Sequence, residues 1–114
     1  LVYWDYYHSE KSHYDAMLAA HETLKNGMWF AGGLWTWAGF APHNAFSIRV
    51  TKAALASCKE AEIKSIFLTL WGDNGGECSR FALLPAMFYA SQMINGETEE
   101  RAISAKFFER FGVT

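Results

Sequence analysis

The sequence lacks the features that mark several classes of protein. It has only two cysteines, Cys58 and Cys78, and nothing in their spacing indicates a disulfide framework or a cysteine metal motif. No uncharged apolar run approaches the roughly 20 residues that a membrane span needs. Ten basic and twelve acidic residues are interspersed and leave a formal net charge of −2, so no basic face forms for nucleic acid or an anionic membrane. We therefore expect neither nucleic acid nor a membrane among the partners.

The beginning of the chain also lacks expected features. No initiator methionine precedes Leu1, and no signal-peptide layout of basic residues, apolar run and cleavage site is visible. A folded domain rarely starts inside an apolar strand, because such a strand needs neighbours on both sides. We expect the chain to be the later part of a longer protein. The sequence leaves the compartment open, with the cytoplasm slightly favoured.

The sequence is rich in apolar and aromatic side chains. Hydrophobic residues make up 51% of the 114 residues and aromatic residues 17%, including five tryptophans. Such a chain can bury enough surface for one domain with a real core, and it is too short for two. This composition excludes intrinsic disorder.

The apolar residues repeat a strand-then-helix pattern three times. Short aromatic and β-branched runs predict strands at residues 1–7, 28–37 and 63–71, and the third reads as continuously buried. The spacing of about 30 to 35 residues is that of a βαβ unit. Continuously apolar strands alternating with helices indicate an α/β fold, with a parallel sheet covered on its faces.

Helix signals follow each predicted strand. The expected boundaries are Ser12 as cap and Asn26–Gly27 as stop of the first helix, Asn44 or Ser47 as cap of the second, and Thr98 as cap of the last. After the third strand, residues 79–94 and 98–111 both read as helical, with Pro85 opening or kinking the first of them. No further strand is predicted.

Each predicted strand ends in aromatic and polar residues. The three endings are Asp5-Tyr6-Tyr7, Trp35-Thr36-Trp37 and Trp71-Gly72-Asp73-Asn74. Because the carboxyl ends of parallel strands meet at one edge of a sheet, we expect these side chains to lie together. A sugar ring packs its C–H face on an aromatic plane and hydrogen-bonds its hydroxyls to polar side chains. The pattern is therefore typical of a carbohydrate site.

Structural explanations compete with this reading at each position. A single tryptophan near a strand end usually fills the core, and Trp29, at the start of its strand, is expected to pack in the core or on the bottom face. Asp73 can serve as a cap for the following helix. Asp5 is harder to explain structurally, because an unpaired acid on a strand costs on the order of several kcal/mol.

Other site chemistries find no support in the sequence. None of the four histidines stands at ligand spacing from another or from a cysteine, so no metal site is expected. Gly32–Gly33 lacks the third glycine of a nucleotide-binding loop, and neither Ser47 nor Ser79 has the flanking glycines of a nucleophile elbow. We expect no cofactor.

Three segments resemble glycoside hydrolase family 20. Residues 32–42 read GGLWTWAGFAP, residues 69–77 read TLWGDNGGE, and residues 2–7 read VYWDYY. They are most similar to the branch that contains hexosaminidase D and the streptococcal N-acetyl-β-glucosaminidases. The Trp-Gly-Asp/Glu ending of the last strand is the most specific piece. The resemblance covers most of residues 1–94.

The resemblance implies a fold for the chain. Residues 1–71 become the last three strands of an eight-stranded (β/α)8 TIM barrel. The domain division that follows is 1–94 for the C-terminal part of the barrel and 95–114 for the start of a helical region after it. The fold class expected is thus α/β, as the C-terminal portion of a barrel followed by helices.

The resemblance also implies an activity. The family removes terminal β-linked GlcNAc or GalNAc with retention: the substrate's own 2-acetamido carbonyl attacks the anomeric carbon. An Asp positions that acetamide, and the adjacent Glu protonates the leaving oxygen. No Asp-Glu dipeptide occurs in this sequence. We therefore expect no catalytic residue in the chain, and we expect the chain alone to be inactive.

What remains for this chain, by resemblance, is the wall of the sugar subsite. The expected substrate-binding residues are Tyr3, Asp5, Tyr6, Trp35, Trp37, Trp71 and Asp73. The tryptophans would surround the sugar and its acetamide, Asp73 would bind outer hydroxyls, and a tyrosine with Asp5 would orient the acetamide or ring. Whether Tyr3 or Tyr6 faces the site depends on strand register, because adjacent side chains alternate faces.

Partners and alternatives follow from the same reading. The expected partners are the terminal N-acetylhexosamine of a glycan and either the missing N-terminal barrel half or another copy of the chain. Barrel strands without their neighbours leave an open edge and an exposed apolar face. Two alternatives stay open: another TIM-barrel glycosidase, and a non-catalytic carbohydrate-binding or interaction module.

Overall fold

The computed structural model describes residues 1–24 and 27–113. Its strands are β1 (Val2–Trp4), β2 (Trp29–Gly33) and β3 (Ser65–Thr69). Its α-helices are α1 (Lys11–Ala20), α2 (Asn44–Glu60), α3 (Leu84–Ile94) and α4 (Glu100–Phe111). Short 3₁₀ turns are η1 (Glu22–Leu24), η2 (Asp73–Gly75) and η3 (Arg80–Leu83). Among the described residues, no helix has the length and apolarity that crossing a bilayer requires.

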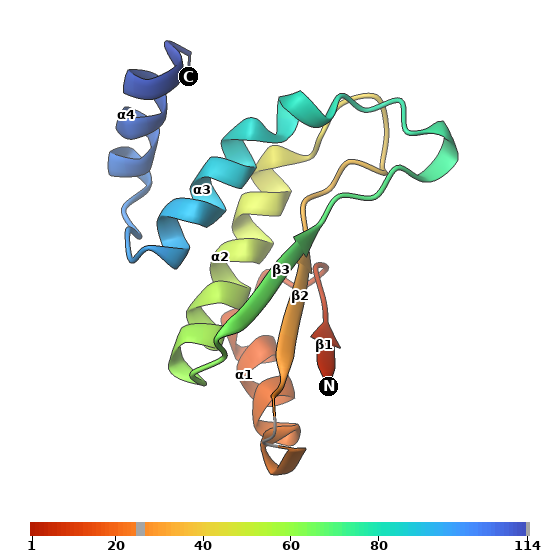
Figure 1. The fold of residues 1–114 in the computed structure, drawn as a ribbon, viewed down its shortest axis with the longest axis vertical. Helices are drawn as coiled ribbons and strands as arrows, with labels where there is room; N and C mark the ends of the chain where they lie inside the picture. Colours follow the sequence, from red (N-terminus) through yellow and green to blue (C-terminus); the bar gives the residue numbers. More distant parts are fainter. Residues whose placement is uncertain (25–26, 114) are drawn as a thin grey trace.

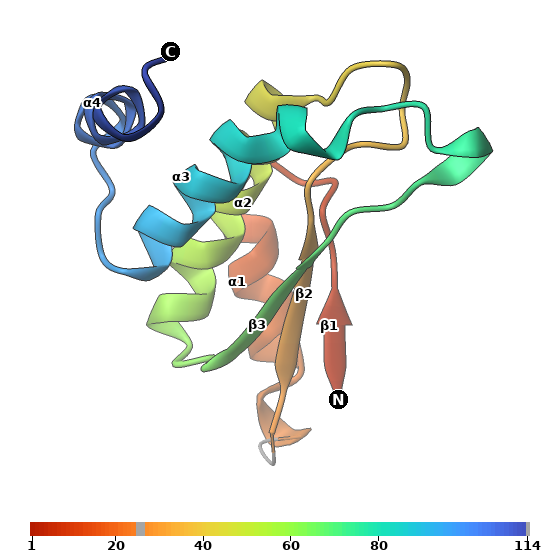
Figure 2. The same cartoon turned by 45° about the horizontal axis from the view of Figure 1, so that its top comes forward.

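The three strands form one parallel sheet in the order β1-β2-β3. Tyr3 pairs with Phe30, and Phe30 pairs with Ile66, which fixes the register across the sheet. Helices α1 and α2 follow β1 and β2 as crossovers and lie with α3 on the same side of the strands (Figures 1 and 2). The predicted α/β class with three parallel strand–helix units is confirmed.

The core lies between the sheet and this helical layer. The three register partners Tyr3, Phe30 and Ile66 point into it, because residues aligned across a parallel sheet share a face. Tyr14 and Leu18 of α1 and Ala54 and Cys58 of α2 complete the cluster, and all four are buried. A second small cluster of Leu34, Leu83 and Ala86 holds α3 against the ends of the strands.

The opposite face of the sheet is uncovered in the described part of the chain. Val2, Trp4, Trp29 and Phe67 point to that side and are each about half exposed. The prediction that β3 is continuously buried is therefore wrong, since Phe67 retains 41% of its accessible surface. Trp29, expected to pack in the core or on the bottom face, is not in the core and packs on Phe67 with ring centroids 6.3 Å apart.

The strands are shorter than predicted, and the first helix differs at both ends. Helix α1 begins at Lys11 after Glu10, without the expected cap from Ser12. Asp15, the expected capping-box partner, instead accepts a hydrogen bond from Ser57 Oγ of α2 at 2.6 Å. The helix ends at Ala20 and continues as η1. Of the predicted stop at Asn26–Gly27, Asn26 lies outside the described residues.

The expected caps of the later helices are also wrong. Helix α2 begins at Asn44 with His43 in the cap position and no side-chain cap bond, and Ser47 is buried inside the helix. Helix α4 begins at Glu100 after Glu99, so Thr98 is not its cap. The two predicted C-terminal helices themselves are confirmed, with Pro85 in the first turn of α3, where its missing N–H costs nothing.

Helix α4 packs on α3 and stands apart from the sheet (Figure 1). The Phe107 ring lies 5.4 Å from Phe88 of α3, and Glu100 accepts a hydrogen bond from Lys52 of α2 at 2.9 Å. The last helix therefore extends the helical layer outward. The division of the chain at residues 94 and 95 stays a prediction.

The buried thiol of Cys58 makes a pH-dependent contribution to stability. Burial raises its pKa from the ordinary 9.0 to about 12, so the folded state favours the neutral thiol. This contribution is fully present below pH 9 and is lost as the pH rises from 9 toward 12. We expect the urea midpoint to fall more steeply between pH 8 and 10.5 in the wild type than in Cys58→Ala. Equal slopes would contradict this account of the thiol.

Candidate functional site

Aromatic side chains from the ends of all three strands meet at one end of the sheet. We call this cluster the aromatic rim: Trp4, Tyr6, Tyr7, Trp35, Trp37 and Trp71. Trp4 stacks on Trp71 with centroids 5.6 Å apart and 25° between the planes. Trp37 lies 5.0 Å from Tyr6 and 4.8 Å from Trp35. The expected convergence of the three strand ends is therefore present.

Side-chain to backbone hydrogen bonds hold the rim together beyond the ends of the strands. Trp35 Nε1 donates to the carbonyl of Tyr6 at 2.9 Å, and the Trp35 amide donates to Ser47 Oγ at 2.8 Å. The Thr36 hydroxyl donates to the carbonyl of Trp71. The bonds from Trp35 Nε1 and the Thr36 hydroxyl link the loops after β1, β2 and β3, and the bond to Ser47 ties the loop after β2 to α2.

Gly33 lets the Tyr6 ring lie directly on the end of β2. A Cβ at position 33 would lie 2.7 Å from Tyr6 Cδ1, closer than real contacts allow. We expect Gly33→Ala to displace this ring and to lower the free energy of unfolding by about 1–3 kcal/mol. Near-UV circular dichroism and urea unfolding measure the two effects.

The matched control is Gly72→Ala. A Cβ there meets nothing closer than 3.6 Å, and Gly72 has a φ of −119° that any residue adopts. Its spectrum and stability should stay close to those of the wild type. An unchanged spectrum and midpoint in Gly33→Ala would contradict the packing of Tyr6 on β2.

The structure settles which tyrosine belongs to the rim. Tyr6 does, whereas Tyr3 is 8% exposed in the core, where its ring packs against Tyr14 and Phe30. Tyr3, one of the expected substrate-binding residues, therefore lies in the core and not at the rim. Trp4, between Tyr3 and Asp5, is 52% exposed and joins the rim. Sequence reasoning missed Trp4, although the alternation of side chains with Tyr6 was a usable signal.

Asp5 lies behind the rim, on the helix side. Its carboxylate accepts hydrogen bonds from the Tyr3 hydroxyl at 3.0 Å and the Tyr7 amide at 2.9 Å, and it meets His8 at 2.8 Å and His13 at 3.1 Å. Burial raises the pKa of Asp5, but hydrogen bonds from Tyr7, His8 and Tyr3 outweigh it and leave the pKa below its ordinary value. This buried acid is thus paired within the fold.

The histidines at Asp5 are a grouping that sequence spacing did not suggest. His8 and His13 stack with ring centroids 3.5 Å apart, and both place a nitrogen beside the same carboxylate. The turn between β1 and α1 brings them together, because it reverses the chain within a few residues. A spacing of five positions in the sequence carries no signal for this.

Asp73 lies at the start of η2 and is exposed. The alternative that it caps the next helix is wrong, because Ser79 and Leu83 occupy the cap positions of η3 and α3. Burial raises the pKa of Tyr6, and the charge of Asp73 adds to that rise.

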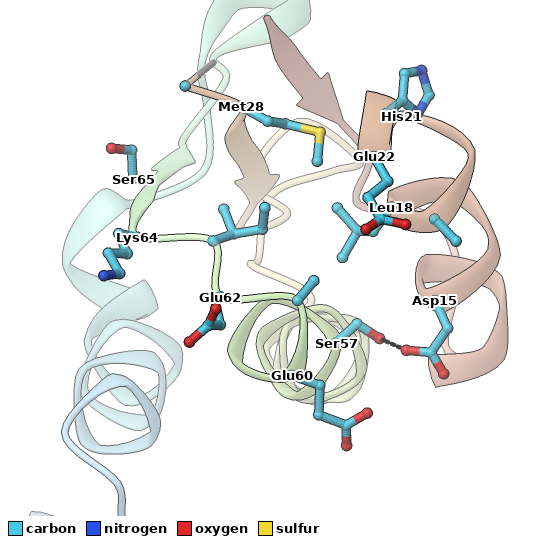
Figure 3. A pocket seen from close by; sticks show the side chains of 14 residues that line it. Asp15, Leu18, His21, Glu22, Met28, Ser57, Glu60, Glu62, Lys64 and Ser65 are labelled. Carbon is cyan, nitrogen blue, oxygen red and sulfur yellow. Dashed lines mark hydrogen bonds between the residues drawn. The ribbon is translucent and has the colours of Figure 1, made fainter. Parts of the chain in front are cut away.

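One cavity in the described structure lies at the other end of the strands. It has a volume of about 820 Å³ between α1, α2 and the residues preceding β2 and β3 (Figure 3). Its acids are partly neutralised within the fold: Asp15 pairs with Ser57 and Lys11, and Glu60 pairs with Lys11 at 2.7 Å. Parallel sheets bind ligands at their carboxyl ends, so we take the aromatic rim as the candidate site.

Comparison with family models and with curated proteins finds no match to this chain. The described structure is that of a small α/β unit with three parallel strands and four α-helices. Its distinguishing feature is an aromatic rim at the carboxyl ends of the strands, beside an uncovered sheet face.

Proposed function

We propose that this chain supplies the sugar-binding wall of a retaining exo-β-N-acetylhexosaminidase of glycoside hydrolase family 20. The observation that carries the proposal is the aromatic rim, because three separate strand ends contribute to it at one edge of a parallel sheet. Stacked, half-exposed indoles such as Trp4 and Trp71 suit the apolar face of a sugar ring. The resemblance of residues 32–42 and 69–77 to that family supplies the substrate class.

The proposal includes the wider architecture of a TIM barrel. In a (β/α)8 barrel, parallel strands carry helices on the outside and pack side chains inward. One face of this sheet carries α1, α2 and α3, and the other exposes Val2, Trp4, Trp29 and Phe67. We propose that this second face is the barrel interior, covered by the remaining strands or, failing those, by another copy of the chain.

Within this proposal the roles of the residues change from those expected. Trp4 takes the place of Tyr3 and stacks with Trp71 on the sugar, while Tyr6 and Trp37 form the adjoining wall. Asp73 hydrogen-bonds the outer hydroxyls. Asp5 acts as a support: it holds the Tyr7 amide at 2.9 Å and so fixes the loop that carries Tyr6.

The chemistry then divides between this chain and the rest of the protein. The 2-acetamido oxygen of the substrate attacks the anomeric carbon, and an acid on another strand protonates the leaving oxygen. The rim contributes by holding the sugar and its acetamide in the geometry for that attack, which is a positioning effect. No Asp-Glu pair is present here to supply the proton.

The experiment that tests the proposal is chromophore release from a β-linked N-acetylglucosaminide, beside the matching β-glucoside, by the whole protein that carries this chain. Hydrolysis of the first alone is the expected result, because the nucleophile is the acetamide. Hydrolysis of both, or of the glucoside alone, would identify another barrel glycosidase. Hydrolysis of neither would overturn the enzymatic proposal in favour of a non-catalytic binding module.

A further inference from the structure

The cluster behind the rim, Asp5 with His8 and His13, has the composition of a metal site. One ligand atom from each residue lies within 4.8 Å of the others. Asp5 Oδ2 is 2.8 Å from His8 Nδ1 and 3.1 Å from His13 Nε2. Two imidazoles and one carboxylate are a common ligand set for divalent first-row metals, and they leave coordination positions open to solvent.

The carboxylate is held in place by partners that are not ligands themselves. The Tyr3 hydroxyl donates to Asp5 Oδ2 and the Tyr7 amide donates to Oδ1. Such outer hydrogen bonds orient metal-binding carboxylates and are a regular part of built sites. The Tyr14 hydroxyl, in turn, donates to the carbonyl of His8 at 2.7 Å, which fixes the backbone of the loop.

The geometry needs only a local adjustment to admit an ion. Ligand atoms about 2.0–2.2 Å from a tetrahedral zinc lie roughly 3.3 Å from one another, so the two measured separations must open by a few tenths of an ångström. The rings stack with 13° between their planes, and one must turn to aim its nitrogen at the ion. His8 can turn, because 48% of its side chain is exposed, whereas His13 is seated on α1 against Tyr14.

We propose that Asp5, His8 and His13 bind a divalent transition-metal ion, with Zn²⁺ the best fit to their oxygen and nitrogen donors and with solvent completing its coordination. The ion joins the end of β1 to the first turn of α1. It lies on the helix side of the sheet, separate from the open face on which the rim receives a sugar. The proposal therefore does not depend on the proposed glycosidase activity.

The test is calorimetric titration of Zn²⁺ into the untagged protein. The expected result is saturable binding of one ion per chain, weakened at least tenfold in His8→Ala and in His13→Ala. The matched control is His43→Ala, because His43 is exposed just before α2 and belongs to no such cluster among the residues that the structure describes. His43→Ala should bind Zn²⁺ as the wild type does.

Because the His13→Ala substitution can also disturb α1, a second measurement tests the ligands through His8 instead: the visible spectrum of bound Co²⁺. Co²⁺ bound by histidine and carboxylate gives visible absorption bands, which should appear with wild type and with His43→Ala and disappear with His8→Ala. Zn²⁺ should also raise the wild-type midpoint of thermal unfolding, because an ion that binds only the folded state stabilises it. Three results would each overturn the proposal: no saturable binding by the wild type, wild-type affinity in His8→Ala, or loss of binding in His43→Ala alone.

Discussion

Replacing Phe30 with alanine is expected to lower the free energy of unfolding by about 3–5 kcal/mol, the range for removing a buried phenylalanine. Phe30 is 1% exposed and lies at the centre of the covered face, between its strand neighbours Tyr3 and Ile66. Its ring centroid lies 5.7 Å from Tyr3 and 6.0 Å from Tyr14. The cavity left by its removal is enclosed by ring systems fixed by their own contacts, so it cannot collapse fully.

The same substitution at Phe81 provides the control. Phe81 lies in η3 and is 93% exposed, so Phe81→Ala should change the stability by less than about 0.5 kcal/mol. Urea unfolding followed by far-UV circular dichroism compares the three proteins. Similar losses in both variants would show that the core is not organised around the covered face of the sheet.

Truncating Trp71 is expected to reduce kcat/KM for a β-linked N-acetylglucosaminide by roughly 30–100-fold. This corresponds to about 2–2.7 kcal/mol, a loss typical of a tryptophan that anchors a ligand. Trp71 stacks on Trp4, so its loss removes one indole and leaves the other without its support. The backbone carbonyl of residue 71 accepts a hydrogen bond from the Thr36 hydroxyl. The Trp71→Ala variant keeps this carbonyl, so we expect the loop to keep its geometry.

Trp29→Ala is the matched control for this effect. Trp29 and Trp71 are exposed to a similar extent, 50% and 39%. Trp29, however, lies at the amino end of β2, whereas Trp71 follows the carboxyl end of β3. Its replacement should leave kcat/KM within about threefold of the wild type, because it is a strand length away from the rim. Unchanged kinetics in Trp71→Ala, or an equal loss in Trp29→Ala, would remove the rim from the catalytic account.

Hydrophobic patterning predicted the order of the elements, the parallel sheet and the convergence of the strand ends. These depend on features that recur along the chain, such as the strand-like run before Gly33 and the helix-like run after Pro42. The pattern failed where a single residue's direction mattered. Tyr3, Trp4 and Tyr6 lie close together in the sequence. Side-chain alternation groups Trp4 with Tyr6, but the folded structure is needed to assign that pair to the rim and Tyr3 to the core.

Hydrophobic patterning also failed to predict the helix boundaries and the clusters of polar side chains. In the sequence, Ser47 resembles the N-cap of the second helix. In the structure it lies inside α2, and its hydroxyl accepts a hydrogen bond from the backbone amide of Trp35 in the loop after β2. In the sequence, Asp5 resembles a substrate-binding residue. In the structure its carboxylate forms hydrogen bonds with the Tyr3 hydroxyl, the Tyr7 amide and the two imidazoles of His8 and His13. Both arrangements depend on contacts between segments that only the folded chain brings together.

The most direct test of the central claim is an NMR titration that follows the five indole N–H signals of this chain, each assigned with a single Trp→Phe variant of the whole protein. N-acetylglucosamine should shift the signals of Trp4, Trp37 and Trp71 together, with one saturation curve, and leave Trp29 unmoved. Glucose, which lacks the acetamide, should bind more weakly. Shifts confined to Trp29, or no saturable shift at the rim, would contradict the assignment of this strand edge as a sugar site.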